Sequence, residues 1–176
     1  TTIVTYQEIG AWLVAPGGLE STEDNIAQVG WDPELPGLVP GTDRVYTLAY
    51  DSDVNNDDTP DSSETKYSVS YDPGIAGAAA SGMPGTQTDL VAGQMVVVAD
   101  ETPTATGYRF TGWASNVAGL AERAGESFLM PGENVVFTAQ WDVQITFLSS
   151  NGFDGESALS YDGGYQTPGQ PLANIP

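Results

Sequence analysis

The sequence predicts a strand-dominated α+β fold built from small domains. Short runs in which apolar and polar side chains alternate, or in which β-branched residues cluster, recur along the 176 residues. Pro-Gly, Asn-Gly and Gly-Gly pairs separate these runs and mark turns. Helical periodicity is rare by comparison. Several strands for each short helix are typical of small α+β domains.

Six strands and two helices are expected in chain order. A weak helix is predicted over 21–29, because acidic residues occupy its first turn and Ile26 and Val29 are three apart. A second helix is predicted over 115–124, with Ser115 as its N-cap and Gly125 as its stop. The strands are predicted over 44–50, 67–71, 94–98, 108–113, 135–141 and 143–147.

The composition excludes several classes of function. The chain has 24 Asp and Glu against 4 Lys and Arg, a formal charge of −20, and neither His nor Cys. Because such an acidic chain repels phosphate backbones and anionic lipids, we expect neither nucleic acid nor a membrane surface as partner. Without His and Cys there is no common zinc site and no Ser-His triad. No apolar run approaches the roughly 20 residues of a membrane helix, so we expect no membrane insertion.

We also predict that the chain is not an enzyme. A glycosidase would need two carboxylates that face each other across a cleft. Nothing in the spacing of Glu101, Glu122, Glu126 and Glu133 singles out such a pair. A glycine-rich phosphate loop with its lysine is missing as well.

Internal similarity divides the chain into repeats. Residues 134–142 parallel residues 43–51, and residues 67–71 parallel residues 143–147. We therefore predict a complete domain over 65–142, the N-terminal part of a next domain over 143–176, and the C-terminal part of a domain over 1–50. Chance similarity within a β-rich sequence of low diversity is the alternative.

The two partial domains can be read as one. Residues 1–12, placed after Pro176, repeat the Pro-Thr, Tyr, Gly and Trp order of residues 103–113. We therefore expect a head-to-tail array in which 143–176 of a neighbouring copy completes 1–50. The array is either one continuous chain or an assembly in which each copy donates strands to the next.

The complete domain resembles the Listeria–Bacteroides repeat, the internalin-type B repeat of bacterial surface proteins. The motif Gly-Tyr-x-Phe-Thr-Gly-Trp at 107–113 and the motif Asn-Val-x-Phe-x-Ala-Gln-Trp at 134–141 carry most of the resemblance, which spans 66–141. The segment 30–50 resembles a variant of the end of this repeat. Either Trp12 or Trp31 takes the place of Trp113.

The resemblance implies a small β-grasp-like domain that occurs in tandem on secreted adhesins. We accordingly expect an extracellular, cell-surface location and a structural role in a fibre or adhesin. The alternative is a glycan- or protein-binding module on a surface stalk, which would show an exposed aromatic cluster or a concave site. Tyr108, Phe110 and Trp113 could form such a sugar-stacking platform, but their alternation favours a place in the core.

An acidic linker over 51–64 is the candidate metal site. Six acids fall within it, and oxygen ligands at alternate positions can converge on a hard cation, which suits Ca²⁺. The stretch resembles the calcium loops found between domains of surface proteins. Counted from its first Asp it departs from an EF-hand loop, because Asn56 stands in the place of Gly and Ser62 in the place of Glu; Asp58 likewise stands where related loops carry Gly. A solvated tether is the alternative. The predicted ligands are Asp51, Asp53, Asn55, Asp57, Asp61 and Glu64.

Lys66 is the only lysine of the chain. An isopeptide crosslink from this lysine to Asn134 is conceivable in a surface fibre. A solvated lysine at the start of a strand is the simpler interpretation, and we prefer it.

Overall fold

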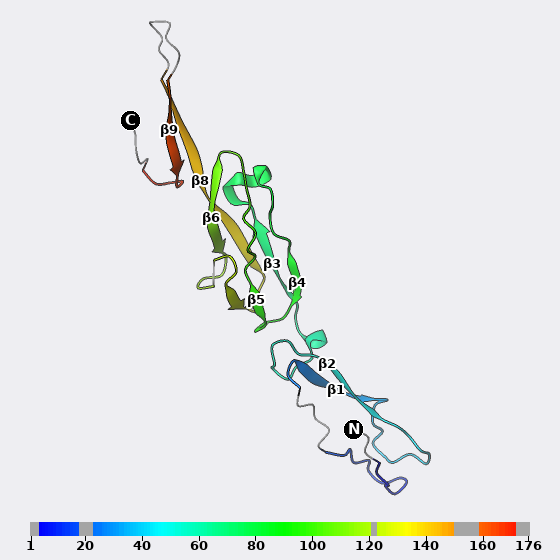
Figure 1. The fold of residues 1–176 in the computed structure, drawn as a ribbon. Coiled ribbons are helices and arrows are strands. Elements are labelled where there is room, and N and C mark those ends of the chain that lie inside the picture. The colour runs from blue at the N-terminus through cyan, green and yellow to red at the C-terminus, as the bar shows by residue number, and fades with distance from the viewer. Residues whose placement is uncertain (1–3, 18–22, 121–122, 150–158, 172–176) are drawn as a thin grey trace. The chain divides into compact units, whose positions relative to one another are not determined.

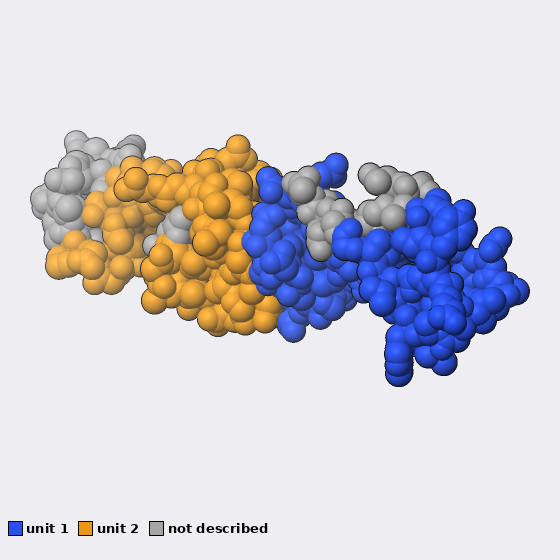
Figure 2. Space-filling model, turned by 90° about the horizontal axis from the view of Figure 1, so that it is seen from below, with its two compact units in different colours: residues 1–66 blue, residues 67–176 orange. Residues whose placement is uncertain are grey.

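The computed structural model describes residues 4–17, 23–120, 123–149 and 159–171 (Figure 1). The chain divides into two compact units, residues 1–66 and residues 67–176 (Figure 2). Within the described residues, nine strands and two short 3-10 helices make up the regular structure. The strand-dominated part of the predicted fold class is therefore confirmed.

A mixed sheet forms the centre of unit 67–176 (Figure 1). Strand β3 pairs in parallel with β8, so that Val69 lies opposite Val135 and Tyr71 opposite Phe137. Strand β4 continues the sheet antiparallel to β3, and β6 lies antiparallel on the opposite side of β8. The order is thus β4-β3-β8-β6, with bounds Tyr67–Asp72 for β3, Gln87–Leu90 for β4, Tyr108–Ser115 for β6 and Val135–Ser149 for β8.

Three further strands and one 3-10 helix complete this unit. Strands β5 (Met95–Val97) and β7 (Ser127–Leu129) form a separate antiparallel ribbon. Strand β9 (Leu159–Gln166) pairs with the second half of β8. The helix η2 (Gly74–Ala79) follows β3. Strand β8 merges the two strands predicted over 135–141 and 143–147, because neither Gly nor Pro separates them and Asp142 between them pairs with Arg109 on β6.

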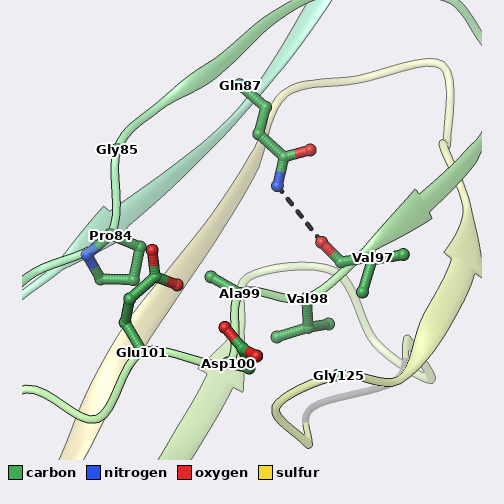
Figure 3. Close-up of a pocket in the computed structure, with 9 residues that line it drawn as sticks. All are labelled: Pro84, Gly85, Gln87, Val97, Val98, Ala99, Asp100, Glu101 and Gly125. Atoms are coloured by element: carbon green, nitrogen blue, oxygen red, sulfur yellow. Dashed lines mark hydrogen bonds between the residues drawn. The ribbon is translucent and has the colours of Figure 1, made fainter.

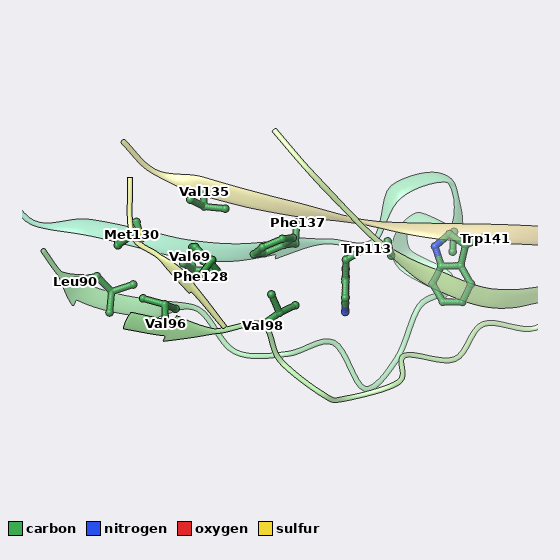
Figure 4. Packing of buried hydrophobic residues seen from close by; sticks show 12 residues of the cluster. Val69, Leu90, Val96, Val98, Trp113, Phe128, Met130, Val135, Phe137 and Trp141 are labelled. Carbon is green, nitrogen blue, oxygen red and sulfur yellow. The ribbon is translucent and has the colours of Figure 1, made fainter. Parts of the chain in front are cut away.

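The core of the unit lies between the sheet and the ribbon (Figure 4). Phe137 is fully buried, and its ring stacks on Tyr71 at 5.7 Å and meets Phe128 edge-on at 5.8 Å. Trp113 is 3% exposed and packs edge-on against Phe110 at 5.0 Å between ring centres. Trp113 therefore belongs to the core, and Tyr108 and Phe110 pack half-buried against it, as their alternation favours.

Unit 1–66 has little core of its own. Strand β1 (Ile26–Asp32) pairs antiparallel with β2 (Thr47–Ser52), and the 3-10 helix η1 (Asp61–Ser63) follows. Ala27 is the only buried apolar side chain among its described residues. Large apolar side chains remain open instead, with exposed fractions of 97% for Tyr6, 78% for Trp12 and 83% for Val45.

The hairpin of unit 1–66 decides which tryptophan matches Trp113. Trp31 faces Leu48 across β1 and β2, as Trp113 faces Ala139 across β6 and β8. In both hairpins the register shifts just before the glycine that precedes the tryptophan. Trp31 therefore takes the place of Trp113, and the predicted alignment of residues 1–12 with 103–113 is wrong.

Neither predicted α-helix forms in the described residues. Residues 26–29 belong to strand β1. Residues 116–120 form bends and turns, because Asn116 prolongs the pairing with β8: its Oδ1 accepts the Val136 N–H at 2.7 Å and its N–H donates to the Val136 carbonyl at 3.1 Å. Gly119 then adopts a left-handed φ of 82° that ends any helical path.

Candidate functional site

The acidic loop folds around one buried carboxylate. Asp53 is 2% exposed, and its Oδ1 and Oδ2 accept the backbone N–H groups of Asp57 and Asp58, each at 3.0 Å. Asn56 and Asp58 take left-handed φ values of 56° and 65°, which turns the chain back toward Asp53. The Asp53 carboxylate is thus the centre around which the loop is wound.

A second group of polar side chains, Asn55, Asp57 and Glu64, lies beside this centre. Asn55 Nδ2 donates to Asp57 Oδ2 and to Glu64 Oε1, each at 3.2 Å. The amide therefore places a partial positive charge between two carboxylates, the position that favours a cation. Glu64 Oε2 is buried and has no hydrogen-bond partner among the described residues. Burial raises the pKa of Glu64, and the charges of Asp57 and Asp61 raise it further.

Two predicted ligands lie at the edges of this group. Asp61 is 7% exposed, and its Oδ1 accepts the Val54 N–H at 3.2 Å. Asp51 lies on β2, where its Oδ1 accepts the Ser52 N–H at 2.8 Å. Hydrogen bonds from Ser62 and Ser52 hold the pKa of Asp51 below its ordinary value. The structure therefore brings Asn55, Asp57 and Glu64 together and holds Asp51 by separate contacts.

The hydrogen bonds fix the register in which the loop is compared with an EF-hand loop. Counting from the central Asp53, Asp58 occupies the sixth position, where such loops carry Gly, and supplies the left-handed turn that Gly would supply. Glu64 then occupies the twelfth position, that of the bidentate Glu. The mismatches at Asn56 and Ser62 arise only when the count starts at Asp51 instead of Asp53. The oxygen-bearing side chains at positions one, three, five, nine and twelve are Asp53, Asn55, Asp57, Asp61 and Glu64.

The described conformation is held by hydrogen bonds between protein groups. Within the part of the chain that the structure describes, no three carboxylates are arranged closely enough to hold a metal ion. Both Asp53 oxygens and Asp61 Oδ1 already accept backbone N–H groups.

A shallow hollow of about 430 Å³ lies in unit 67–176 (Figure 3). Gln87 spans part of it and donates from Nε2 to the Val97 carbonyl at 3.2 Å. Asp100 and Glu101 bring two carboxylates to its rim. No aromatic side chain lines it, so this hollow does not supply the stacking surface expected of a glycan site. The lining residues are Pro84, Gly85, Gln87, Val97, Val98, Ala99, Asp100, Glu101 and Gly125.

The ion pair between Arg109 and Asp142 is not evident from the sequence. Arg109 on β6 donates to Asp142 Oδ2 on β8, and Thr167 donates from Oγ1 to Asp142 Oδ1 at 2.8 Å. The guanidinium carbon of Arg109 also lies 5.2 Å from the centre of the Tyr165 ring. These hydrogen bonds, above all that from Arg109, lower the pKa of Asp142. The only indication of this ion pair in the sequence is that basic residues are scarce.

Asn134 has a structural task in the same unit. Its Oδ1 accepts the Ser68 N–H at 2.9 Å, which ties the start of β3 to the start of β8. Lys66 has an exposed side chain. This exposure agrees with the solvated lysine that the sequence favours, and none of these contacts supports the isopeptide crosslink.

A comparison with known protein families gives a match over part of the chain. Residues 67–145 match the family model of the divergent InlB B-repeat domain. This match confirms the resemblance to the Listeria–Bacteroides repeat. No significant match was found among the curated proteins or the solved structures. In the described residues, none of the helices has the length and apolar character needed to cross a membrane.

Proposed function

We propose that this chain is a structural segment of an extracellular fibre or adhesin built from tandem repeats, because residues 67–145 match the divergent InlB B-repeat domain, a family found in bacterial surface proteins. The family match is the observation that carries the proposal. The sheet order β4-β3-β8-β6, with a parallel central pair, supports a β-grasp-like domain. The net charge of −20 keeps neighbouring fibres apart in solution.

Electron microscopy of surface material tests this role. We expect antibodies against the chain to label intact cells, and sheared surface material to contain long filaments of uniform width that carry the label. Isolated labelled particles without filaments would contradict the fibre. They would favour the alternative, a glycan- or protein-binding module, for which the open Tyr6 and Trp12 side chains offer stacking surfaces.

We further propose that the acidic loop binds Ca²⁺ through Asp53, Asn55, Asp57, Asp61 and Glu64. Two observations support this proposal. The first is that the buried Glu64 Oε2 has no hydrogen-bond partner among the described residues. The second is that the loop carries an oxygen-bearing side chain at each side-chain ligand position of an EF-hand calcium loop and differs from it at the Gly position. Bound Ca²⁺ would neutralise carboxylates that otherwise repel one another. The loop would then be stiffened against bending and proteolysis.

Calcium is expected to stabilise the loop in unit 1–66. At a calcium concentration 100 times the dissociation constant, the gain in free energy is about 2.7 kcal/mol. Calorimetry and timed proteolysis near Asn56, each with calcium and with a chelator, measure it. The variants Asp53→Asn and Glu64→Gln should lose the response, whereas Glu133→Gln, an exposed glutamate outside the loop, should keep it. Equal melting and equal cleavage with and without calcium would contradict the proposal.

The response should also depend on pH in a defined direction. Since the pKa of Glu64 is raised in the folded loop, the carboxyl holds a proton there at pH values where it is ionised in the unfolded chain. Without calcium, its contribution to stability is therefore largest at low pH and is lost as the pH rises through the raised pKa. Calcium needs the ionised form, so its stabilising effect grows over the same range.

A further inference from the structure

Unit 1–66 reproduces the ribbon of the complete repeat, hydrogen bond by hydrogen bond. In the complete repeat Gly93 N–H donates to the Met130 carbonyl and Met130 N–H donates to the Gln94 carbonyl, both at 2.8 Å. In unit 1–66 Gly10 N–H donates to the Val39 carbonyl at 3.0 Å, and Val39 N–H donates to the Ala11 carbonyl at 2.8 Å. Gly10 and Gly93 share a left-handed φ, of 81° and 80°. The ribbon β5–β7 thus has a counterpart here.

The hairpin of unit 1–66 reproduces β6–β8 in the same detail. Ile26 faces Ser52, and Tyr108 faces Val143, at the start of each hairpin. Gly30 and Gly112 follow the register shift with φ values of 148° and 146°. From the ribbon to the end of the hairpin, residues 10–52 therefore correspond to residues 93–143. What they do not include is a counterpart of β3 and β4.

A second pair of strands like β3 and β4 lies at the other end of the chain. Val143 faces Gln166 across β8 and β9, as Tyr67 faces Leu90 across β3 and β4, with the same spacing along the chain. In the complete repeat the free edge of β3 pairs in parallel with residues 135–138. Residues 145–149 of β8 have β9 as their only strand partner among the described residues. This hairpin thus offers an open edge.

In unit 1–66, the side chains that correspond to core residues of the complete repeat are more exposed. Phe137 and Trp141 are 0% and 4% exposed in the complete repeat, whereas their counterparts Tyr46 and Tyr50 are half-buried and 38% exposed. Residues 43–46, which correspond to the β8 residues that β3 covers, belong to no strand among the described residues. A strand such as β3 would both pair with them and cover the rings.

We propose that the paired strand segments 143–149 of β8 and 159–166 of β9 in one copy complete unit 1–66 of a second copy. The parallel register of β3 with β8 gives the expected register between copies: Ile145 beside Arg44, Thr146 beside Val45 and Phe147 beside Tyr46. The inference rests on the proposed structural role, because it names the partner with which the surface segment assembles. A chain that gives and receives such a hairpin extends head to tail and does not close on a single pair.

Engineered disulfides test the register, since the chain has no Cys. Val45 and Thr146 are exposed, and their counterparts Val136 and Ser70 are paired across β8 and β3. Paired strand positions lie within the Cα separation that a disulfide spans. Mixed Val45→Cys and Thr146→Cys proteins should give an oxidised species of twice the chain mass on non-reducing gels. The double variant should give a ladder of larger species.

The matched control is Val29→Cys mixed with Thr146→Cys. Val29 is 56% exposed and corresponds to Thr111 on β6, which does not border β3, so this mixture should run at the mass of a single chain on the same non-reducing gels. Equal crosslinking of both mixtures, or none in either, would overturn the inference. A double variant that crosslinks only within one chain would overturn it too, because the hairpin would then be received by its own copy.

A packing variant gives a second readout. Ile145 corresponds to Val69, which is fully buried in the complete repeat. For the unmodified chain we expect large species in light scattering. Ile145→Asp should abolish them, whereas Thr146→Asp at the neighbouring exposed position should retain most of them. Labelled filaments on cells without the Val45–Thr146 crosslink would leave the fibre role intact and reject this mode of assembly. Crosslinked chains without filaments would do the opposite.

Discussion

Replacing Phe137 by Ala should remove about 3–5 kcal/mol from the free energy of unfolding of unit 67–176. The ring is fully buried and contacts Tyr71 and Phe128, so its loss leaves a cavity that neighbouring rings cannot fill without leaving their rotamers. It also lies on β8 opposite Tyr71, where the two central strands pair. The variant therefore weakens the packing and the parallel pairing together.

Urea unfolding followed by tryptophan fluorescence measures this loss, because Trp113 and Trp141 lie in the same core. Leu129→Ala is the matched control, since Leu129 is 58% exposed on β7. It should change the free energy of unfolding by no more than about 0.5 kcal/mol. If the two variants were equally stable, the assignment of Phe137 to the centre of the core would be wrong.

Gly74→Ala should lower the free energy of unfolding of the same unit by at least about 2 kcal/mol. Gly74 starts η2 with a left-handed φ of 60°, and its N–H donates to Asp72 Oδ1 at 2.7 Å. A Cβ at this position would lie 2.5 Å from the carbonyl oxygen of Ala139. Because that oxygen belongs to the backbone of β8, the clash displaces the central strand.

Gly85→Ala separates this effect from the general effect of replacing a glycine. Gly85 has no left-handed φ, and no atom lies within 4 Å of an added Cβ. The alanine there should be neutral or stabilise the unit by up to about 1 kcal/mol, through the entropy of the unfolded chain. Thermal melts of the two variants side by side give the comparison. Matching melting temperatures would contradict the close approach of Gly74 to β8.

The strands were predictable because their side chains alternate over several residues. The expected strand over 67–71 is β3, the strand over 108–113 lies within β6, and the strand over 94–98 contains β5. The helix expected over 115–124 failed because local spacing does not reveal a tertiary contact. Asn116 bonds to Val136, twenty residues away, and this pairing outweighs a weak helical preference.

The candidate loop shows the same limit. The sequence identified its ligand types but not the residue at its centre. Asp51 and Asp53 are equivalent in the alternating pattern. Only the hydrogen bonds that Asp53 accepts from backbone N–H groups identify it as the first residue of the loop. The match between unit 1–66 and the repeat was obscured for a similar reason. Trp12 and Trp31 both follow a glycine closely, and strand register was needed to choose between them.

The parallel pairing of β3 with β8 determines how the repeat responds to tension. In the proposed tandem array, tension would draw the start of β3 and the far end of β8 in opposite directions along their common axis. The hydrogen bonds between the strands run across that axis, so they share the force and must break together instead of unzipping one by one. Resistance to pulling is set by the rate of unfolding and not by equilibrium stability. We therefore expect such a repeat to yield abruptly, at a high threshold force, when a cell is dragged by flow.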